Sequence, residues 1–184
     1  MKRSVTTLLL FVFATMGVYA QGEQNSLKDV PASERIVVGG GFGLGFSSTQ
    51  DYFMVSPSIG YMLTRKLMAG TSLSYQHTKY KFTSPSISVN AYGIGPFTRF
   101  VIYENIFLQA EYEYLTYKLP GLTQSFDSFL AGGGFVQPLG SKASIYFIAL
   151  YNFSYTTPRQ GEFSPYGSPL VIRGGISFGG FGIY

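Results

Sequence analysis

Apolar and polar residues alternate along most of the chain from residue 35 onward, in extended segments separated by turn-forming residues. Successive side chains of a β-strand point to opposite faces, so this period of two predicts strands with one apolar face. No segment sustains the i, i+3, i+4, i+7 spacing of an amphipathic helix. The pattern predicts eight strands, at residues 36–46, 52–63, 67–80, 87–102, 106–117, 126–137, 143–155 and 170–178, the last with an alternative end at Tyr184.

The first clear hairpin turns at residues 64–66 and has two faces of different character. The apolar face pairs Leu63–Leu67, Tyr61–Ala69, Ile59–Thr71, Pro57–Leu73 and Val55–Tyr75. The other face pairs Met62–Met68, Gly60–Gly70, Ser58–Ser72, Ser56–Ser74 and Met54–Gln76. A slip of one residue would move every side chain to the other face, so the agreement of polarity along both strands supports this pairing. We therefore predict one apolar face and one face of small and polar residues.

The second hairpin turns at residues 103–105 and repeats this division. Its apolar face pairs Phe100–Leu108, Thr98–Ala110, Pro96–Tyr112 and Ile94–Tyr114, and its other face pairs Arg99–Gln109, Phe97–Glu111 and Gly95–Glu113. Glycine opposite glutamate leaves room for a charged side chain in a confined interior. In the third hairpin, residues 126–155, both faces of the second strand are apolar. We place Ser128, Asn152 and Ser154 on one face. The opposite face then carries Phe129, Phe135, Ile145, Phe147, Tyr151 and Phe153.

The even strand count predicts an all-β fold, an eight-stranded antiparallel up-and-down β-barrel. Alternation by itself does not separate a transmembrane barrel from a soluble barrel with an apolar pocket. Three features favour the transmembrane barrel. The polar face is built from Gly, Ser and a few charges instead of many Lys and Glu, and Tyr and Phe cluster toward the strand ends, as in aromatic girdles. Connections are short at one end and longer at the other, at residues 81–86 and 156–169.

The N-terminal residues give a fourth feature, because residues 1–20 are predicted to be a secretory signal peptide. Lys2 and Arg3 precede a short apolar core, and Ala20 ends a cleavage site with small residues. That core is shorter than the roughly 20 residues of a spanning helix. Residues 21–34 are polar and lack periodic apolar positions, which predicts a flexible periplasmic leader. Residues 35–184 then form the barrel, in a Gram-negative outer membrane with both termini in the periplasm.

Composition narrows the classes of function. Charged residues make up only 12% of the 184 residues, against about 25% in soluble domains. The absence of Cys excludes disulfide scaffolds, zinc fingers and thiol nucleophiles. The glycine-rich residues 39–45 lack the Gly-Lys-Ser/Thr ending of a phosphate loop. We expect no cofactor, no metal and no nucleic-acid partner.

Five polar residues of the predicted inner face are candidates for an interior network: Arg99, Gln109, Glu111, Glu113 and Arg173. Buried charges are tolerated when they are paired and hydrogen-bonded. Two interpretations stay open, a structural plug and a gate. The lumen of eight strands is just wide enough for side chains, which favours the plug.

Four basic residues on or near the longer loops, Lys79, Lys81, Lys118 and Arg159, are candidates for contact with lipopolysaccharide phosphates. A solvated loop surface explains them equally well. His77, the only histidine, is predicted on the outer face opposite Phe53. A lipid A deacylase would need a serine two residues from this histidine, but positions 75 and 79 are Tyr and Lys. We therefore interpret His77 as an interfacial residue.

The run GIGPFTRF at residues 93–100, followed by FLQAEYEY at residues 107–114, resembles a strand hairpin of the small bacterial outer-membrane barrels of the OmpX and OmpA transmembrane-domain type. The resemblance covers residues 35–184. It implies a barrel in contact with outer-membrane lipid and lipopolysaccharide, and a last strand that the barrel assembly machinery reads. Either residues 176–178 or residues 179–184 could be that signal.

With no catalytic constellation in the sequence, we expect a non-enzymatic envelope protein of the OmpX-like, porin-like kind, with a plugged polar interior and a role in envelope structure or surface interaction. The first alternative is a narrow channel or transporter for small solutes. A lipid A-modifying enzyme is the more distant alternative. The sequence indicates neither the ligand nor the oligomeric state.

Overall fold

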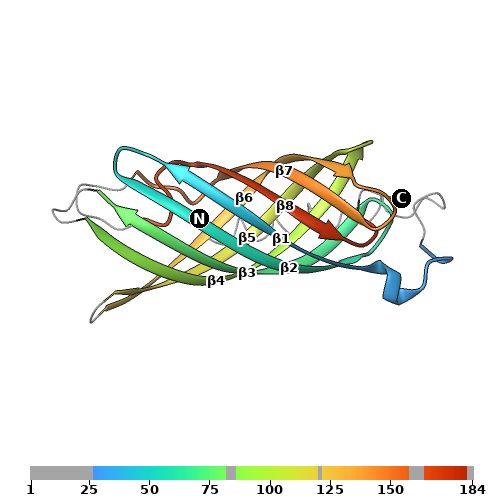
Figure 1. Ribbon diagram of the computed structural model, residues 1–184, viewed down its shortest axis with the longest axis horizontal. Helices are drawn as coiled ribbons and strands as arrows, with labels where there is room; N and C mark the ends of the chain where they lie inside the picture. Colours follow the sequence, from blue (N-terminus) through green and yellow to red (C-terminus); the bar gives the residue numbers. More distant parts are fainter. Residues whose placement is uncertain (1–26, 82–85, 120–121, 158–163, 182–184) are drawn as a thin grey trace, which may run out of the picture.

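A computed structural model of the chain describes residues 27–81, 86–119, 122–157 and 164–181. Its strands form one closed barrel in which each strand pairs antiparallel with its neighbours in sequence and the last pairs with the first (Figure 1). The strands are β1 (Ile36–Phe46), β2 (Gln50–Met62), β3 (Leu67–Tyr80), β4 (Ile87–Tyr103), β5 (Ile106–Leu119), β6 (Leu122–Pro138), β7 (Ala143–Asn152) and β8 (Leu170–Phe178). The predicted eight-stranded up-and-down barrel is confirmed.

The register of the predicted hairpins is also confirmed. Met62 pairs with Met68 between β2 and β3, and Arg99 pairs with Gln109 between β4 and β5. In the ambiguous third hairpin, the side chains predicted to share one face point outward, including Phe135, Phe147 and Tyr151. The polarity of paired residues was therefore sufficient to set the register, because the side-chain period is two.

Several strand ends differ from the prediction by one to four residues, and the largest differences are at the start of β6 and the end of β7. β5 and β6 extend to Leu119 and Leu122, because their ladder continues past a hydroxyl pair between Thr116 and Ser125 at 3.2 Å. β7 ends at Asn152 and not at residue 155, because the Asn152 side chain accepts a hydrogen bond from the backbone N–H of Ser154, which turns the chain. β8 ends at Phe178, the first of its two predicted ends, since Gly179 turns with a φ of +123°.

The outer surface of the barrel is apolar on every strand. Outward positions carry exposed large side chains that include Phe42 on β1, Ile59 on β2, Leu73 on β3, Ile94 on β4, Tyr112 on β5, Phe135 on β6, Phe147 on β7 and Ile172 on β8. Of the described charged residues, Asp127 points outward on β6, and the others lie inside the barrel, at its two ends or in the segment before β1. The outer wall is thus a mainly apolar band between two charged rims.

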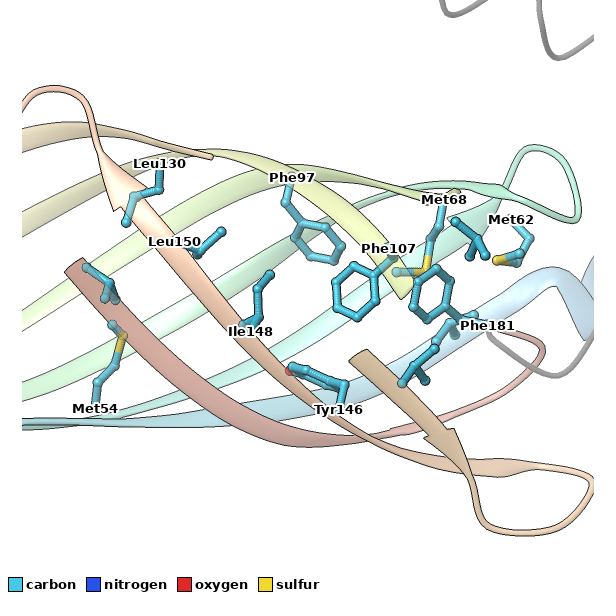
Figure 2. Close-up of a cluster of buried hydrophobic side chains, with 14 of the residues drawn as sticks. Met54, Met62, Met68, Phe97, Phe107, Leu130, Tyr146, Ile148, Leu150 and Phe181 are labelled. Atoms are coloured by element: carbon cyan, nitrogen blue, oxygen red, sulfur yellow. The ribbon is translucent and has the colours of Figure 1, made fainter. Parts of the chain in front are cut away.

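The interior is less polar than the sequence indicated. Serines do line part of it, among them Ser56, Ser72 and Ser74, but large apolar side chains fill the remainder (Figure 2). The inward face of β2 and β3 includes Met54, Met62 and Met68, and β7 contributes Ile148 and Leu150. The expectation of a small and polar inner face therefore holds only in part, because bulky side chains also lie at the level of the charged residues, where Ile148 pairs with Arg173.

The structure describes the segment before β1 from Leu27 onward, and residues 21–26 of the predicted flexible leader lie outside the described residues. The described part of this segment makes a turn and a short 3₁₀ helix (Ala32–Arg35) at the barrel end that also carries the C-terminal end of β8 (Figure 1). The Arg35 guanidinium donates to the backbone oxygen of Leu27 at 2.7 Å and to that of Val30 at 2.9 Å. The side chain of Leu27 is buried in the core cluster. Within the described residues, no helix has the length and apolar character that crossing a membrane requires.

Adjacent glycines of β6 give a test of how closely the wall is packed. A Cβ on Gly132 would lie 2.0 Å from the backbone oxygen of Ala149, whereas a Cβ on Gly133 would meet nothing nearer than 3.6 Å. We expect Gly132→Ala to lower the free energy of unfolding in urea by about 1–3 kcal/mol, because β7 must shift. Gly133→Ala is the matched control and should change it by less than about 0.5 kcal/mol. Equal values for the two variants would contradict the register of β6 against β7.

Candidate functional site

A buried ion network crosses the middle of the lumen. Arg173 on β8 reaches two carboxylates on β5, with its guanidinium nitrogens 2.9 Å from Glu111 Oε1 and 3.1 Å from Glu113 Oε1. All three side chains are almost fully buried, with exposed fractions of 6%, 2% and 0%. They converge because 111, 113 and 173 are inward positions of strands that face each other across the barrel. One arginine therefore joins opposite walls of the lumen.

Arg99 joins this network through the side-chain amide of Gln109. Its Nε donates to Gln109 Oε1 at 2.5 Å, and Gln109 Nε2 donates to Glu111 Oε2 at 2.7 Å. The sequence placed Arg99 diagonally from Glu111, but no ion pair joins them in the described structure. The guanidinium lies instead 4.3 Å from the ring centre of Tyr146 and 4.9 Å from that of Phe97. Aromatic faces thus stabilise the second cation.

The five predicted interior residues therefore come together in one network, and its formal charges balance. Two arginines face two glutamates, and Glu111 accepts from both Arg173 and Gln109. A residual cavity of about 20 Å³ lies among these side chains. A single water needs about 10–15 Å³, so this space is of the order of one water. The middle of the barrel is filled.

Tyr166, which the sequence did not single out, completes the network from the connection between β7 and β8. Its hydroxyl donates to Glu113 Oε2 and accepts from Arg173 at 2.9 Å. The neighbouring carbonyl of Pro165 accepts from Gln76 Nε2 at 2.7 Å. The ring packs edge-on against Tyr52, with centroids 5.6 Å apart. Residues 164–167 thus close the loop end of the barrel, by which we mean the end that carries the connection between β7 and β8.

Phe181 closes the opposite end, which we term the turn end. After the turn at Gly179 its ring is fully buried and packs edge-on against Phe107 with centroids 5.4 Å apart (Figure 2). The Ser144 hydroxyl donates to its backbone oxygen at 3.3 Å. Of the two candidate assembly signals, residues 176–178 are the end of β8, whereas Phe181 points into the lumen. Residues 182–184 lie outside the described part of the chain.

Three of the four predicted basic residues lie in the described part of the chain. Lys79 and Lys118 are exposed near the loop end. Lys81 Nζ lies 2.7 Å from Asp51 Oδ1, which offsets its charge. Arg159 falls outside the described residues. His77 is exposed opposite Phe53, as predicted, and its Nδ1 lies 2.8 Å from Asn90 Oδ1.

Among the residues that the structure describes, no group of three or more His, Asp or Glu could hold a metal ion. No protein-family model matches the chain, and no curated protein matches it significantly. Among solved structures, the chain is similar to the N-terminal β-barrel domain of Pseudomonas aeruginosa OprF, at 13% sequence identity and a TM-score of 0.45. The alignment covers 78% of this chain and 96% of that domain. At this level, nothing about the function of that domain transfers to this chain.

The ion network gives a test by substitution and rescue. Arg173→Met removes the partner of two buried carboxylates, so we expect the free energy of unfolding to fall by about 3–5 kcal/mol. Adding Glu111→Gln and Glu113→Gln removes the uncompensated charges and should restore at least half of this loss. Urea unfolding of the refolded barrel, followed by the compact band on unheated gels, measures both effects. A triple variant no more stable than Arg173→Met would contradict the role of Arg173 as their charge partner.

Proposed function

We propose that this protein is a non-enzymatic β-barrel of the outer membrane, plugged along its lumen, that acts in envelope structure or surface interaction. The observation that carries this proposal is the apolar band on all eight strands. Its side chains are large and exposed, with exposed fractions of 60% for Leu73 and 58% for both Phe147 and Ile172. Soluble monomers rarely expose apolar patches larger than a few hundred Å². A closed barrel is a form in which strands can cross lipid, because every backbone group then has a partner.

The distribution of charge supports the same proposal against a soluble ligand-binding barrel. A soluble barrel with an apolar pocket carries its charges outside, where water solvates them. Here Arg99, Glu111, Glu113 and Arg173 are inside, and the other described charges of the barrel lie at its rims, apart from Asp127 on the outer face of β6. The predicted signal peptide, residues 1–20, would deliver such a chain to the periplasm. The turn end, which carries the start of β1 and the end of β8, would then face the periplasm, where the assembly machinery would meet β8.

The plugs support a structural role and weigh against the narrow channel. Tyr166 fills the lumen from the loop end, Phe181 fills it from the turn end, and the ion network occupies the middle. The exposed Lys79 and Lys118 remain available on the proposed extracellular side for anionic groups such as lipopolysaccharide phosphates. A surface role would therefore depend on the loop end and not on the lumen.

Two isoleucine-to-lysine substitutions on neighbouring strands test the membrane setting. Ile94 lies at the middle of β4 and Ile106 at the turn end of β5, and both point outward with exposed fractions of 48% and 45%. In lipid, Ile94→Lys should cost about 2–4 kcal/mol of unfolding free energy and Ile106→Lys about 0–1 kcal/mol. Unfolding from lipid vesicles by urea measures both. If the outer face met water, both would lie within about 0.5 kcal/mol of the parent.

Conductance tests the plugged lumen. In planar bilayers, we expect the protein to give no current steps above those of a protein-free bilayer, because a space of the size of one water remains at the ion network. Single-channel recording across a range of voltages is the measurement. Reproducible steps that scale with salt concentration would contradict the plug and favour a channel for small solutes.

A further inference from the structure

The seam between β1 and β8 is the least complete part of the wall. Its ladder has six residue pairs, whereas β1 and β2 share eleven. The ladder ends at Gly43 and Arg173, and the same register would next pair Leu44 with Ile172 and, two residues on, Phe46 with Leu170. Neither pair forms in the described part of the chain. The two strands therefore separate toward the loop end.

A cavity of about 210 Å³, which we term the slot, lies where these strands separate. Outward side chains line it, including Leu44, Phe46 and Ile172, and so do the inward Gln50 and Tyr52. Residues of both faces share one cavity, so the slot passes into the wall of the barrel. The ring of Tyr52 forms its inner side, close against Gly45, where a Cβ would lie 1.9 Å from the ring. Further polar groups come from the connections, at Ser47 and Ser168.

A second recess, which we term the hollow, lies on the outside of the same seam, nearer the turn end. It has a volume of about 510 Å³, and its surroundings include Val38, Phe42, Ile176 and Phe178. Gly40 also lines it, at an outward position of β1 that carries no side chain. No polar side chain lines the hollow. The seam therefore presents a mixed polar and apolar slot toward the loop end and an apolar hollow toward the middle of the wall.

We propose that this seam binds one lipid of the surrounding bilayer, with an acyl chain in the hollow and its ester or hydroxyl groups in the slot. This inference rests on the proposed membrane setting. Backbone groups of separated strands at membrane depth need partners, and ester oxygens or hydroxyls can supply them. No charged side chain lines the slot, so it fits the uncharged linkage region of a lipid better than its phosphate.

The dimensions agree with a lipid of one leaflet. Gly40 and Phe46 are six residues apart on β1, which is about 20 Å along a strand. At the usual strand tilt of about 40°, this corresponds to a depth of about 15 Å. Half of a hydrocarbon core of about 30 Å is the same length. If the polar end of a lipid faces the loop end, its linkage region would lie beside the polar groups of the slot, and its acyl chain would lie in the apolar hollow.

Native mass spectrometry of the full-length protein, extracted in detergent and mixed with dipalmitoyl phosphatidylethanolamine, tests the site. We expect one retained lipid per protein, saturating as lipid is added. Gly40→Leu fills the hollow and Ile172→Trp fills the slot, so each should lower the retained fraction at least fivefold. The matched controls are Gly133→Leu and Ile94→Trp, which change outward positions on β6 and β4, and both should retain lipid as the parent does.

Other outcomes would contradict the proposed lipid site. Equal retention in all four variants, or no retained lipid in the parent, would show general contact with the annular lipid only. A dimer that Gly40→Leu abolishes would instead assign the hollow to a second copy of the chain. Heat-dependent gel migration of each variant separates these results from misfolding, and the Ile172→Trp variant keeps the test decisive if Gly40→Leu does not fold. A protein without a heat shift, found in the soluble fraction, would refute the membrane setting itself.

Discussion

Closure of a single hydrogen-bonded sheet of eight strands is the constraint on which the structure depends. A sheet with a free edge in lipid leaves backbone groups unpaired, at a cost of several kcal/mol for each group. Seven ladders join neighbours in sequence, and the eighth joins β1 to β8 across the whole chain. This last ladder is also the shortest, with six pairs. The proposed lipid site therefore lies where the constraint is least completely met.

Closure also creates a lumen that must be filled. An eight-stranded barrel is just wide enough for side chains, so the interior packs as a core and not as a pore. The middle is filled by charged side chains whose formal charges balance, and the two ends are filled by Tyr166 and Phe181. Both aromatic residues lie outside the strands. The segments that follow β7 and β8 thus supply what the inward strand positions do not.

Tyr52 connects the lumen with the seam. Its ring packs edge-on against Tyr166, which holds Glu113 and Arg173, and the same ring forms the inner side of the slot. A lipid bound in the slot would therefore touch the side chain that supports the plug at the loop end. In this arrangement the outer face, the seam and the ion network form one connected set of contacts, although the lumen itself is filled.

The sequence alone determined the strand number, the hairpin registers and the inward direction of Arg99, Glu111 and Arg173, because a period of two is a local property of each strand. It could not determine which arginine pairs with which glutamate, since Arg173 meets Glu111 from 62 residues away across the lumen. It also missed Tyr166, Phe181 and the early end of the β1–β8 ladder, which have no periodic signal. These features were decided by the tertiary structure, because they depend on how a closed barrel fills its interior and joins its two ends.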